Sequence, residues 1–208
     1  MNRSFLRFIL FSMLTLGFVA SFALAGGQIG DSFTLKKKTS RNLIEGLSQG
    51  GIWDHVDCMT ELDGYLYVHE NLTNNIYKIA IESNGGLGRY QRVGSRNAVW
   101  NDVISLVGLN HQLYVLQKSS KNVYGVDPRN GNYRIIGKAA LWNNATRMVA
   151  GGNKLYIHQT TKDIYSLDPN SGRYDMRGKP AIWNDVNCMA GNPGESEVFV
   201  HQTTSKNI

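Results

Sequence analysis

The four tryptophans of this 208-residue chain occupy the same position of an internal repeat. Each is followed by an apolar–aromatic pair and then, in the first three units, by two further tyrosine positions. The steps between successive tryptophans are 47, 42 and 41 residues, a period typical of units that fold as one four-stranded blade of a β-propeller. The tryptophans are Trp53, Trp100, Trp142 and Trp183, and the pairs are Leu66-Tyr67, Leu113-Tyr114, Leu155-Tyr156 and Val198-Phe199.

The second unit shows how one repeat divides into strands. Tyr, Val, Ile and Leu dominate four short runs, and Gly, Asn and Pro separate them. Residues 127–131 read Asp-Pro-Arg-Asn-Gly and residues 168–172 read Asp-Pro-Asn-Ser-Gly, with Pro early and Gly late as a tight reversal requires. After residue 25 there is no helical periodicity, so we predict an all-β protein. The strands predicted for the second unit are 102–108, 112–117, 122–127 and 132–138.

The first 25 residues have the pattern of a signal peptide. They carry Arg3 and Arg7, a long apolar run and the small residues Ala23 and Ala25 before the expected cleavage site. We therefore predict a secreted protein, periplasmic in a bacterium, with residues 26–208 as one β-propeller domain. An uncleaved membrane anchor is the alternative, and no later run is long enough to span a bilayer.

The charge of the chain points away from nucleic acid as a partner. The formal net charge of +6 falls to +4 once the two leader arginines are removed. The densest basic run, residues 36–38, has no aromatic–basic platform beside it. We read it as a solvated strand edge, because lysines protect edges from unwanted pairing.

The repeat also predicts how the ends of the chain meet. The fourth unit has runs for a first and a second strand, and the N-terminal segment 31–44 has the spacing of a third and a fourth, with Phe33 at a tyrosine position. We therefore predict a four-bladed propeller whose last blade the N-terminal segment completes, which leaves no open edge. The alternative is a fragment of a propeller with five or more blades.

The two cysteines occupy equivalent positions. Cys58 and Cys188 each lie five residues after a tryptophan, in the first and last units. In a four-bladed ring these units are neighbours and their first strands line the axis, so we predict a Cys58–Cys188 disulfide, which an oxidising export compartment permits. The alternative is two buried free thiols too far apart to bridge.

The first unit carries the sequence Gly50-Gly51-Ile52-Trp53-Asp54, then Asp63-Gly64-Tyr65-Leu66-Tyr67, then Ile76-Tyr77-Lys78. In this run, roughly a quarter of the chain, it resembles the blades of tachylectin-type lectins. Later units keep the Trp and the Leu-Tyr pair but lose the paired glycines, and that family has five blades. A four-blade ring with a disulfide between its first and last blades is similar to hemopexin-like domains, although their sequence hallmarks are absent. The resemblance to the lectins implies non-catalytic carbohydrate binding between blades.

Polar side chains recur in two links that a propeller places on one face. These are the link that enters each first strand and the link between the second and third strands. Carboxamides donate and accept hydrogen bonds at once, which suits sugar hydroxyls. We therefore predict a lectin-like binding module rather than an enzyme, with glycans or glycoproteins as partners. The predicted ligand-binding residues are Trp53, Asp54, Asn101, Asp102, Asn143, Asn184, Asp185, Gln117, Gln159 and Gln202.

A different interpretation of the same residues stays open. Each tryptophan is then a packing wedge between blades, and each Asn or Asp after it is a turn cap. A protein-interaction scaffold and a calcium-dependent hydrolase or lactonase are the alternative functions. Calcium would bind on the axis through oxygen ligands of Asp54, Asn101, Asn143 and Asn184, and otherwise no cofactor is predicted.

Catalytic and metal-binding patterns are few. Residues 46–50 spell G-x-S-x-G, but they lie in a link between strands rather than in the strand–turn–helix that this nucleophile motif needs. His69, His158 and His201 are repeat-equivalent and could hold a metal, yet strand alternation places them against the neighbouring blade. Asn71 and Asn144 begin glycosylation sequons.

Overall fold

The computed structural model of this protein describes residues 55–83, 85–95 and 99–203, all within one compact unit, Ile52–Ile208. The predicted signal peptide, the segment 31–44 and the residues Trp53 and Asp54 lie outside the described residues. Closure of the last blade by the N-terminal segment and the number of blades therefore stay predictions.

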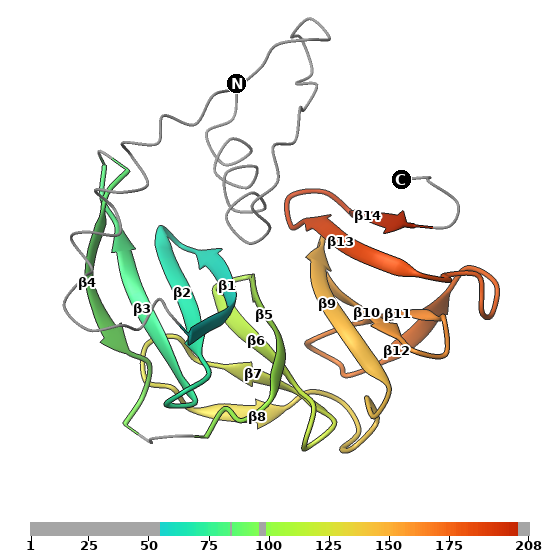
Figure 1. Cartoon of the computed structure of the whole chain (residues 1–208), viewed down its shortest axis with the longest axis horizontal. Coiled ribbons are helices and arrows are strands. Elements are labelled where there is room, and N and C mark those ends of the chain that lie inside the picture. Colours follow the sequence, from blue (N-terminus) through green and yellow to red (C-terminus); the bar gives the residue numbers. More distant parts are fainter. Residues whose placement is uncertain (1–54, 84, 96–98, 204–208) are drawn as a thin grey trace, which may run out of the picture. The chain divides into compact units, whose positions relative to one another are not determined.

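The described strands form successive antiparallel sheets, each in chain order (Figure 1). Blade 1 consists of β1 (Val56–Leu62), β2 (Tyr65–Glu70), β3 (Asn75–Ile81) and β4 (Leu87–Arg92). Blade 2 consists of β5 (Val103–Leu109), β6 (Gln112–Gln117), β7 (Asn122–Val126) and β8 (Tyr133–Ile135). Blade 3 consists of β9 (Ala145–Gly151), β10 (Lys154–Gln159), β11 (Ile164–Leu167) and β12 (Tyr174–Arg177). Unit 4 contributes β13 (Val186–Asn192) and β14 (Glu197–Gln202), which pair with each other.

The turns end the strands where the sequence predicts. Asn110 and His111 join β5 to β6 with φ angles of 49° and 61°, the positive values of a tight hairpin. In the turn between β7 and β8, the Gly131 N–H donates to the Asp127 carbonyl at 2.8 Å. The strand β8 covers only three of the seven residues predicted for it, because the chain leaves the sheet early to reach the next blade.

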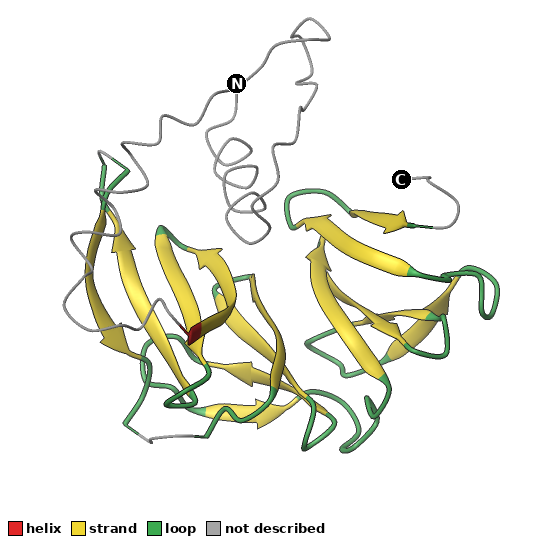
Figure 2. Ribbon diagram, viewed as in Figure 1, coloured by secondary structure: helices red, strands yellow, loops and turns green. Residues whose placement is uncertain are grey.

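The described part consists of strands and turns, apart from a 3-10 position at His55 that is red in Figure 2, and it has no α-helix. The prediction of an all-β protein is confirmed. No helix in these residues is long and apolar enough to cross a membrane.

The hydrophobic core lies between blades rather than inside any one of them. The first strands neighbour one another in chain order, with β1 beside β5, β5 beside β9 and β9 beside β13. Tyr67 of blade 1 shares one buried cluster with Leu106 and Val115 of blade 2, and Leu116 of blade 2 shares another with Ile157 of blade 3. Four-stranded meanders joined in this way through their faces form a β-propeller, as the repeat predicts.

A β-bulge recurs near the start of every first strand, four residues after the tryptophan position. The pairing of each first strand with its second strand skips one residue there. A bulge changes the direction of the extra residue's side chain. The side chain at this repeat position can therefore contact groups on the side of the sheet from which regular strand alternation would turn it away. The bulge residues are Asp57, Ile104, Thr146 and Asn187.

Candidate functional site

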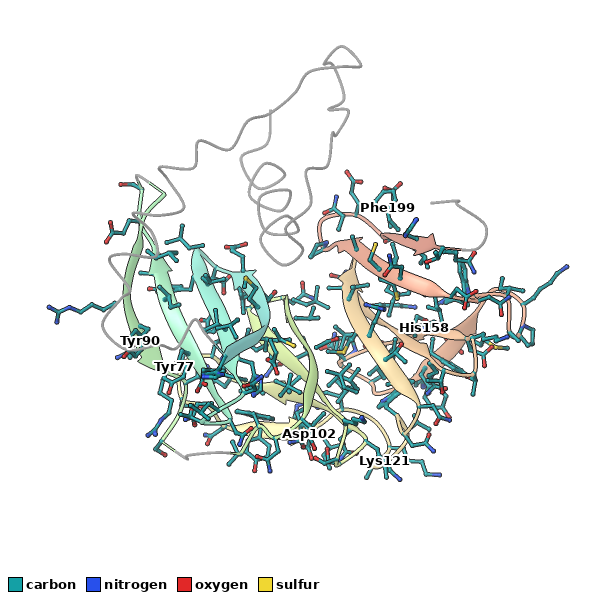
Figure 3. All side chains as sticks on the ribbon, in the orientation of Figure 1. Tyr77, Tyr90, Asp102, Lys121, His158 and Phe199 are labelled. Atoms are coloured by element: carbon teal, nitrogen blue, oxygen red, sulfur yellow. The ribbon has the colours of Figure 1, made fainter. Side chains whose placement is uncertain are left out.

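In every unit, the link that enters the first strand lies beside the link between the second and third strands. Asp102 and Lys121, from the two links of blade 2, lie at the same end of the strands in Figure 3. A backbone N–H of the second link donates to a carbonyl of the first: Asn71 to His55 at 2.9 Å, Lys118 to Asp102 at 2.9 Å, Thr160 to Asn144 at 2.8 Å and Thr203 to Asp185 at 3.1 Å. We call the surface formed by these paired links the loop face.

The tryptophans next to the loop face are packing residues. Trp100 is 4% exposed and Trp142 is 2% exposed, whereas Trp183 is half-buried. Rings enclosed to this degree offer no face to a sugar, so the ligand role predicted for Trp53 has no parallel in Trp100 or Trp142. Each of these two rings lies edge-on to two tyrosines of its own blade with centroids 5.1–6.0 Å apart: Trp100 with Tyr124 and Tyr133, and Trp142 with Tyr165 and Tyr174.

Two of the predicted glutamines hold the entering link in place. Gln117 is buried, and its Nε2 donates to the Val99 carbonyl at 3.3 Å. The Nε2 of Gln202 donates to the carbonyls of Ile182 and Asn184, at 2.9 Å each. These carboxamides already make hydrogen bonds inside the fold, so their role is to position the link that follows the preceding blade.

The equivalent residues of blades 1 and 3 bind their own turns. The buried Glu70 carboxylate accepts hydrogen bonds from the backbone N–H groups of Leu72 and Thr73, at 2.9 Å each, and from the Thr73 hydroxyl. Burial alone would raise the pKa of Glu70, but these hydrogen bonds hold the pKa below its usual value. In blade 3 the Thr161 hydroxyl donates to Gln159 Oε1 at 3.4 Å.

The residues directly after the tryptophans are the open part of the loop face. Asp102 and Asp185 both have a φ of 51°, a left-handed conformation that Asp tolerates better than most residues. Of the eight predicted ligand residues that the structure describes, those open to solvent at least in part are Asn101, Asp102, Asn143, Asn184, Asp185 and Gln202.

The bulge residue of blade 1 binds a buried histidine that reaches the next blade. His69 Nδ1 lies 2.6 Å from Asp57 Oδ1, and His69 Nε2 lies 2.8 Å from the Trp100 carbonyl oxygen. His69 thus links the bulge residue of blade 1 to the tryptophan that enters blade 2.

Blade 3 makes the same contact with a neutral pair. His158 Nε2 lies 3.2 Å from the Trp183 carbonyl oxygen, and Nδ1 lies 2.6 Å from the Thr146 hydroxyl. Because a carbonyl only accepts, Nε2 carries the proton and Nδ1 accepts from Thr146. Burial lowers the pKa of His158 below its ordinary value, which agrees with a neutral ring. Blade 2 has the apolar residues Ile104 and Leu116 at the two positions.

His69 therefore joins blade 1 to blade 2, and His158 joins blade 3 to unit 4. Among the described residues, no group of three His, Cys, Asp or Glu side chains is placed to hold a metal ion.

The predicted Cys58–Cys188 disulfide is not formed, and both residues are free thiols. Cys58 packs in the cluster between blades 1 and 2, where its sulfur is hydrogen-bonded to the backbone of Leu106 on β5. Ser105, the equivalent residue of blade 2, accepts a hydrogen bond from the Met148 N–H on β9 at 3.0 Å. In blades 1 and 2 this position therefore joins the first strand to the next first strand, and the Cys58 thiol is directed to blade 2. Burial is the main cause that raises the pKa of Cys58 to about 12, so the thiol is unreactive at neutral pH.

Two hollows between blades 1 and 2 were not predicted from the sequence. They open beside a close contact of Gly94, after β4, with Gly131, in the turn between β7 and β8. The first, about 260 Å³, is the aromatic hollow, lined by Val93, Gly94, Ser95, Val99, Trp100, Asn130, Gly131, Asn132 and Tyr133. The second, about 330 Å³, is the basic hollow, lined by Lys78, Gln91, Arg92, Val93, Gly94, Ser95, Pro128, Arg129 and Asn130.

The aromatic hollow combines an accessible ring with polar groups. Tyr133 is 40% exposed, and its ring is held edge-on against Trp100 at 5.1 Å between centroids. Asn132 beside it is exposed. The Asn130 carboxamide is fixed by the turn, since its Nδ2 donates to Asp127 at 3.0 Å and its Oδ1 accepts from the Asn132 N–H at 2.8 Å. The hollow thus presents a fixed aromatic edge and preoriented amide groups.

Comparison with known proteins identifies the fold alone. No protein-family model and no curated protein matches the sequence. A solved protein of unknown function from Bacteroides thetaiotaomicron is similar in structure, with a TM-score of 0.51 and 12% identity over 73% of this chain and 46% of that chain. PorZ, a surface component of the type-IX secretion system of Porphyromonas gingivalis, has a TM-score of 0.45 and 15% identity over 70% of this chain and 18% of that chain.

A chain of the nidogen/laminin complex has a TM-score of 0.43 and 13% identity over 56% of this chain and 43% of that chain. The chain therefore spans less than half the length of each of these three solved proteins.

Proposed function

We propose that this protein is an exported, non-catalytic binding module and that its ligand is a saccharide. The proposal keeps the lectin-like character implied by the first repeat but moves the binding site from the loop face to the junction of blades 1 and 2. Glycans or glycoproteins are then the partners. The module requires no cofactor, because recognition rests on hydrogen bonds and stacking alone.

The observation that carries the proposal is the aromatic hollow. Saccharides bind proteins by placing an apolar ring face on an aromatic side chain while hydroxyls exchange hydrogen bonds with amides and carboxamides. Tyr133 is 40% exposed in the hollow and Asn132 is beside it. The Tyr133 ring is already held by Trp100, so little side-chain freedom is lost when a ligand packs on it.

The loop face supports this proposal less well. Its glutamines are engaged inside the fold, and Trp100 and Trp142 are enclosed. The exposed residues Asn101 and Asn143 follow these enclosed tryptophans, and the half-buried Trp183 precedes Asn184. We therefore assign these residues to the turns.

Glycan-array binding of the whole chain, followed by titration of the best ligand, tests the proposal. Tyr133→Ala should weaken binding of that ligand by up to about tenfold, because an aromatic contact contributes about 0.5–1.5 kcal/mol. Tyr174→Ala is the matched control, since Tyr174 is the equivalent residue of blade 3, is 42% exposed and contacts Trp142 at 5.6 Å. If the wild type and Tyr133→Ala bind the ligand with equal affinity, the ligand does not bind in the aromatic hollow.

A protein-interaction scaffold is the second candidate, because the outer strands carry exposed apolar side chains. Ile135 on β8 and Met176 on β12 are each 40% exposed. Exposed apolar groups that recur at one repeat position suit a protein surface better than a saccharide. Two results together would favour the scaffold. No glycan on a broad array binds the protein, and a partner protein that binds the wild type no longer binds Ile135→Thr/Met176→Thr.

A further inference from the structure

The two hollows meet and differ in chemical character. They share the lining residues Val93, Gly94, Ser95 and Asn130, so they lie next to each other at the junction of blades 1 and 2, and we call the two together the groove. Tyr133 and Asn132 line one end of this groove. The other end is lined by three cations, and its lining contains no carboxylate.

The cations at the basic end are not equally neutralised. The Lys78 ammonium lies 3.7 Å from the centroid of the Tyr65 ring, and it forms no ion pair with a carboxylate of the described residues. The Arg92 guanidinium donates to the carbonyls of Gly94 and Ser95, at 3.3 and 3.2 Å, which hold it in place without cancelling its charge.

The third cation has a carboxylate behind it. Arg129 is bound through two nitrogens to Asp127, at 3.1 and 3.0 Å. Asp127 cancels one of the three positive charges, so the basic end keeps an excess of two. An ion-paired arginine still has N–H groups to donate to a second anion.

These cations are departures from the repeat. The position of Lys78, one residue after the core tyrosine of the third strand, is Gly125 in blade 2 and Ser166 in blade 3. The position of Arg92 is Ile135 and then Met176. Blade folding does not require positive charge at these places, because two other blades fold without it. Lys78 and Arg92 therefore distinguish this junction, whereas the junction of blades 2 and 3 carries Arg134, which donates to the Pro169 carbonyl at 3.4 Å.

We propose that the groove binds an acidic saccharide, with a sugar ring on Tyr133 and its carboxylate or sulfate group among Lys78, Arg92 and Arg129. This proposal rests on the proposed saccharide-binding function and names the class of its ligand. A charged oxygen group next to a sugar ring fits a groove with one aromatic and one cationic end. Charge-assisted hydrogen bonds from lysine and arginine are the strong ones, and the guanidinium fork matches both carboxylate and sulfate.

Titration calorimetry of the whole chain with three oligosaccharides of one backbone tests this. One is neutral, one carries carboxylates and one carries sulfates. We expect at least one acidic form to bind about tenfold or more tightly than the neutral form, with an affinity that falls as salt is added. The comparison of the two acidic forms identifies the preferred group.

Two double variants test whether the cations of the groove cause the preference for the acidic oligosaccharide. Lys78→Gln/Arg92→Gln should abolish it, whereas Lys118→Gln/Lys162→Gln removes the same charge from exposed links and should leave it intact. If the first double variant does not fold, Arg129→Gln replaces it, because that side chain is 84% exposed.

The outcomes separate the two proposals. Equal binding of neutral and acidic forms, sensitive to Tyr133→Ala, would contradict the acidic ligand and keep the saccharide-binding function. An acidic preference that both double variants lose equally would show non-specific attraction and overturn the groove. Absence of binding by all three oligosaccharides would contradict both proposals.

Discussion

The loop face is built from residues that recur in every blade, whereas the groove between blades 1 and 2 contains residues found in only one blade. At the loop face similar residue types recur because they hold the links in place: Gln117 and Gln202 bind the entering link, and Glu70 and Gln159 bind their own turns. In the groove the decisive residues, Lys78 and Arg92, are those that the other blades lack. Recurrence in this protein therefore marks what every blade needs to pack. A residue that departs from the repeat marks a junction that can bind a ligand in addition to packing.

The largest effect should come from the enclosed tryptophans of the loop face. Trp142→Ala should destabilise the fold by about 3–5 kcal/mol, because it empties the cluster between blades 2 and 3. Trp183→Ala should cost less, since Trp183 is half-buried. Chemical denaturation measures both, and equal effects of the two would contradict the packing role that we assign to burial.

The next effect concerns the glycine contact beside the groove. Gly131→Ala should cost about 2–4 kcal/mol, because Gly131 has a φ of +73° and an added Cβ would lie 2.5 Å from the Gly94 Cα. Gly85→Ala is the control, with a φ of +83° and nothing within 4 Å of the added atom. The difference between the two melting temperatures isolates the contact between blades from the backbone strain.

Substitutions at the loop face should have smaller effects on stability, and these effects should be larger for residues that position a link than for exposed residues. Gln202→Ala should cost about 1–3 kcal/mol, because the Ile182 and Asn184 carbonyls lose their donor. Asn101→Ala and Asn143→Ala should change stability by no more than about 0.5 kcal/mol. Urea denaturation of the three variants tests the ranking, and a reversed order would return the asparagines to a capping role.

The smallest effect is a pH dependence of the junction after blade 3. Burial depresses the pKa of His158 in the folded state, so the unfolded chain binds the proton more readily. The stabilising contribution of neutral His158 is present above about pH 6.5, the ordinary value for histidine, and is lost as the pH falls below it. One such group changes stability by at most about 1.4 kcal/mol per pH unit.

The blade 2 pair provides a control for that dependence. Thr146→Ile/His158→Leu installs the residues found at Ile104 and Leu116, which cannot titrate. Melting temperatures between pH 5 and 7 should vary less in this double variant than in the wild type. An unchanged slope would show that His158 does not carry the dependence.

Periodic features of the fold could be predicted from the sequence, and features that depend on side-chain direction could not. The tryptophan period and the Asp-Pro-x-x-Gly turns predicted blades, strands and their order. The bulge at Asp57 and its equivalents left no sequence signal, although it decides that His69 meets Asp57 and reaches Trp100. The predicted disulfide failed for the same reason, since spacing places Cys58 on a first strand without showing that its thiol faces β5.

Part of the groove can be predicted from the residues that depart from the repeat. Lys78 stands where Gly125 and Ser166 stand, and this is visible in an alignment of the units. Two facts about the groove needed coordinates. One is that blades 1 and 2 approach through Gly94 and Gly131, and the other is that Tyr133, 40% exposed, lines the hollow beside this contact.

The central claim, that a saccharide is recognised between blades 1 and 2 rather than at the loop face, is tested most directly by NMR. Backbone amide shifts of the isotope-labelled whole chain are followed while an oligosaccharide found on the array is added. The claim predicts that the largest changes fall on Gly94, Ser95 and 130–133, with Asn143 and Asn184 unaffected. Changes that instead gather on Asn101, Asn143 and Asn184 and leave 130–133 in place would contradict it.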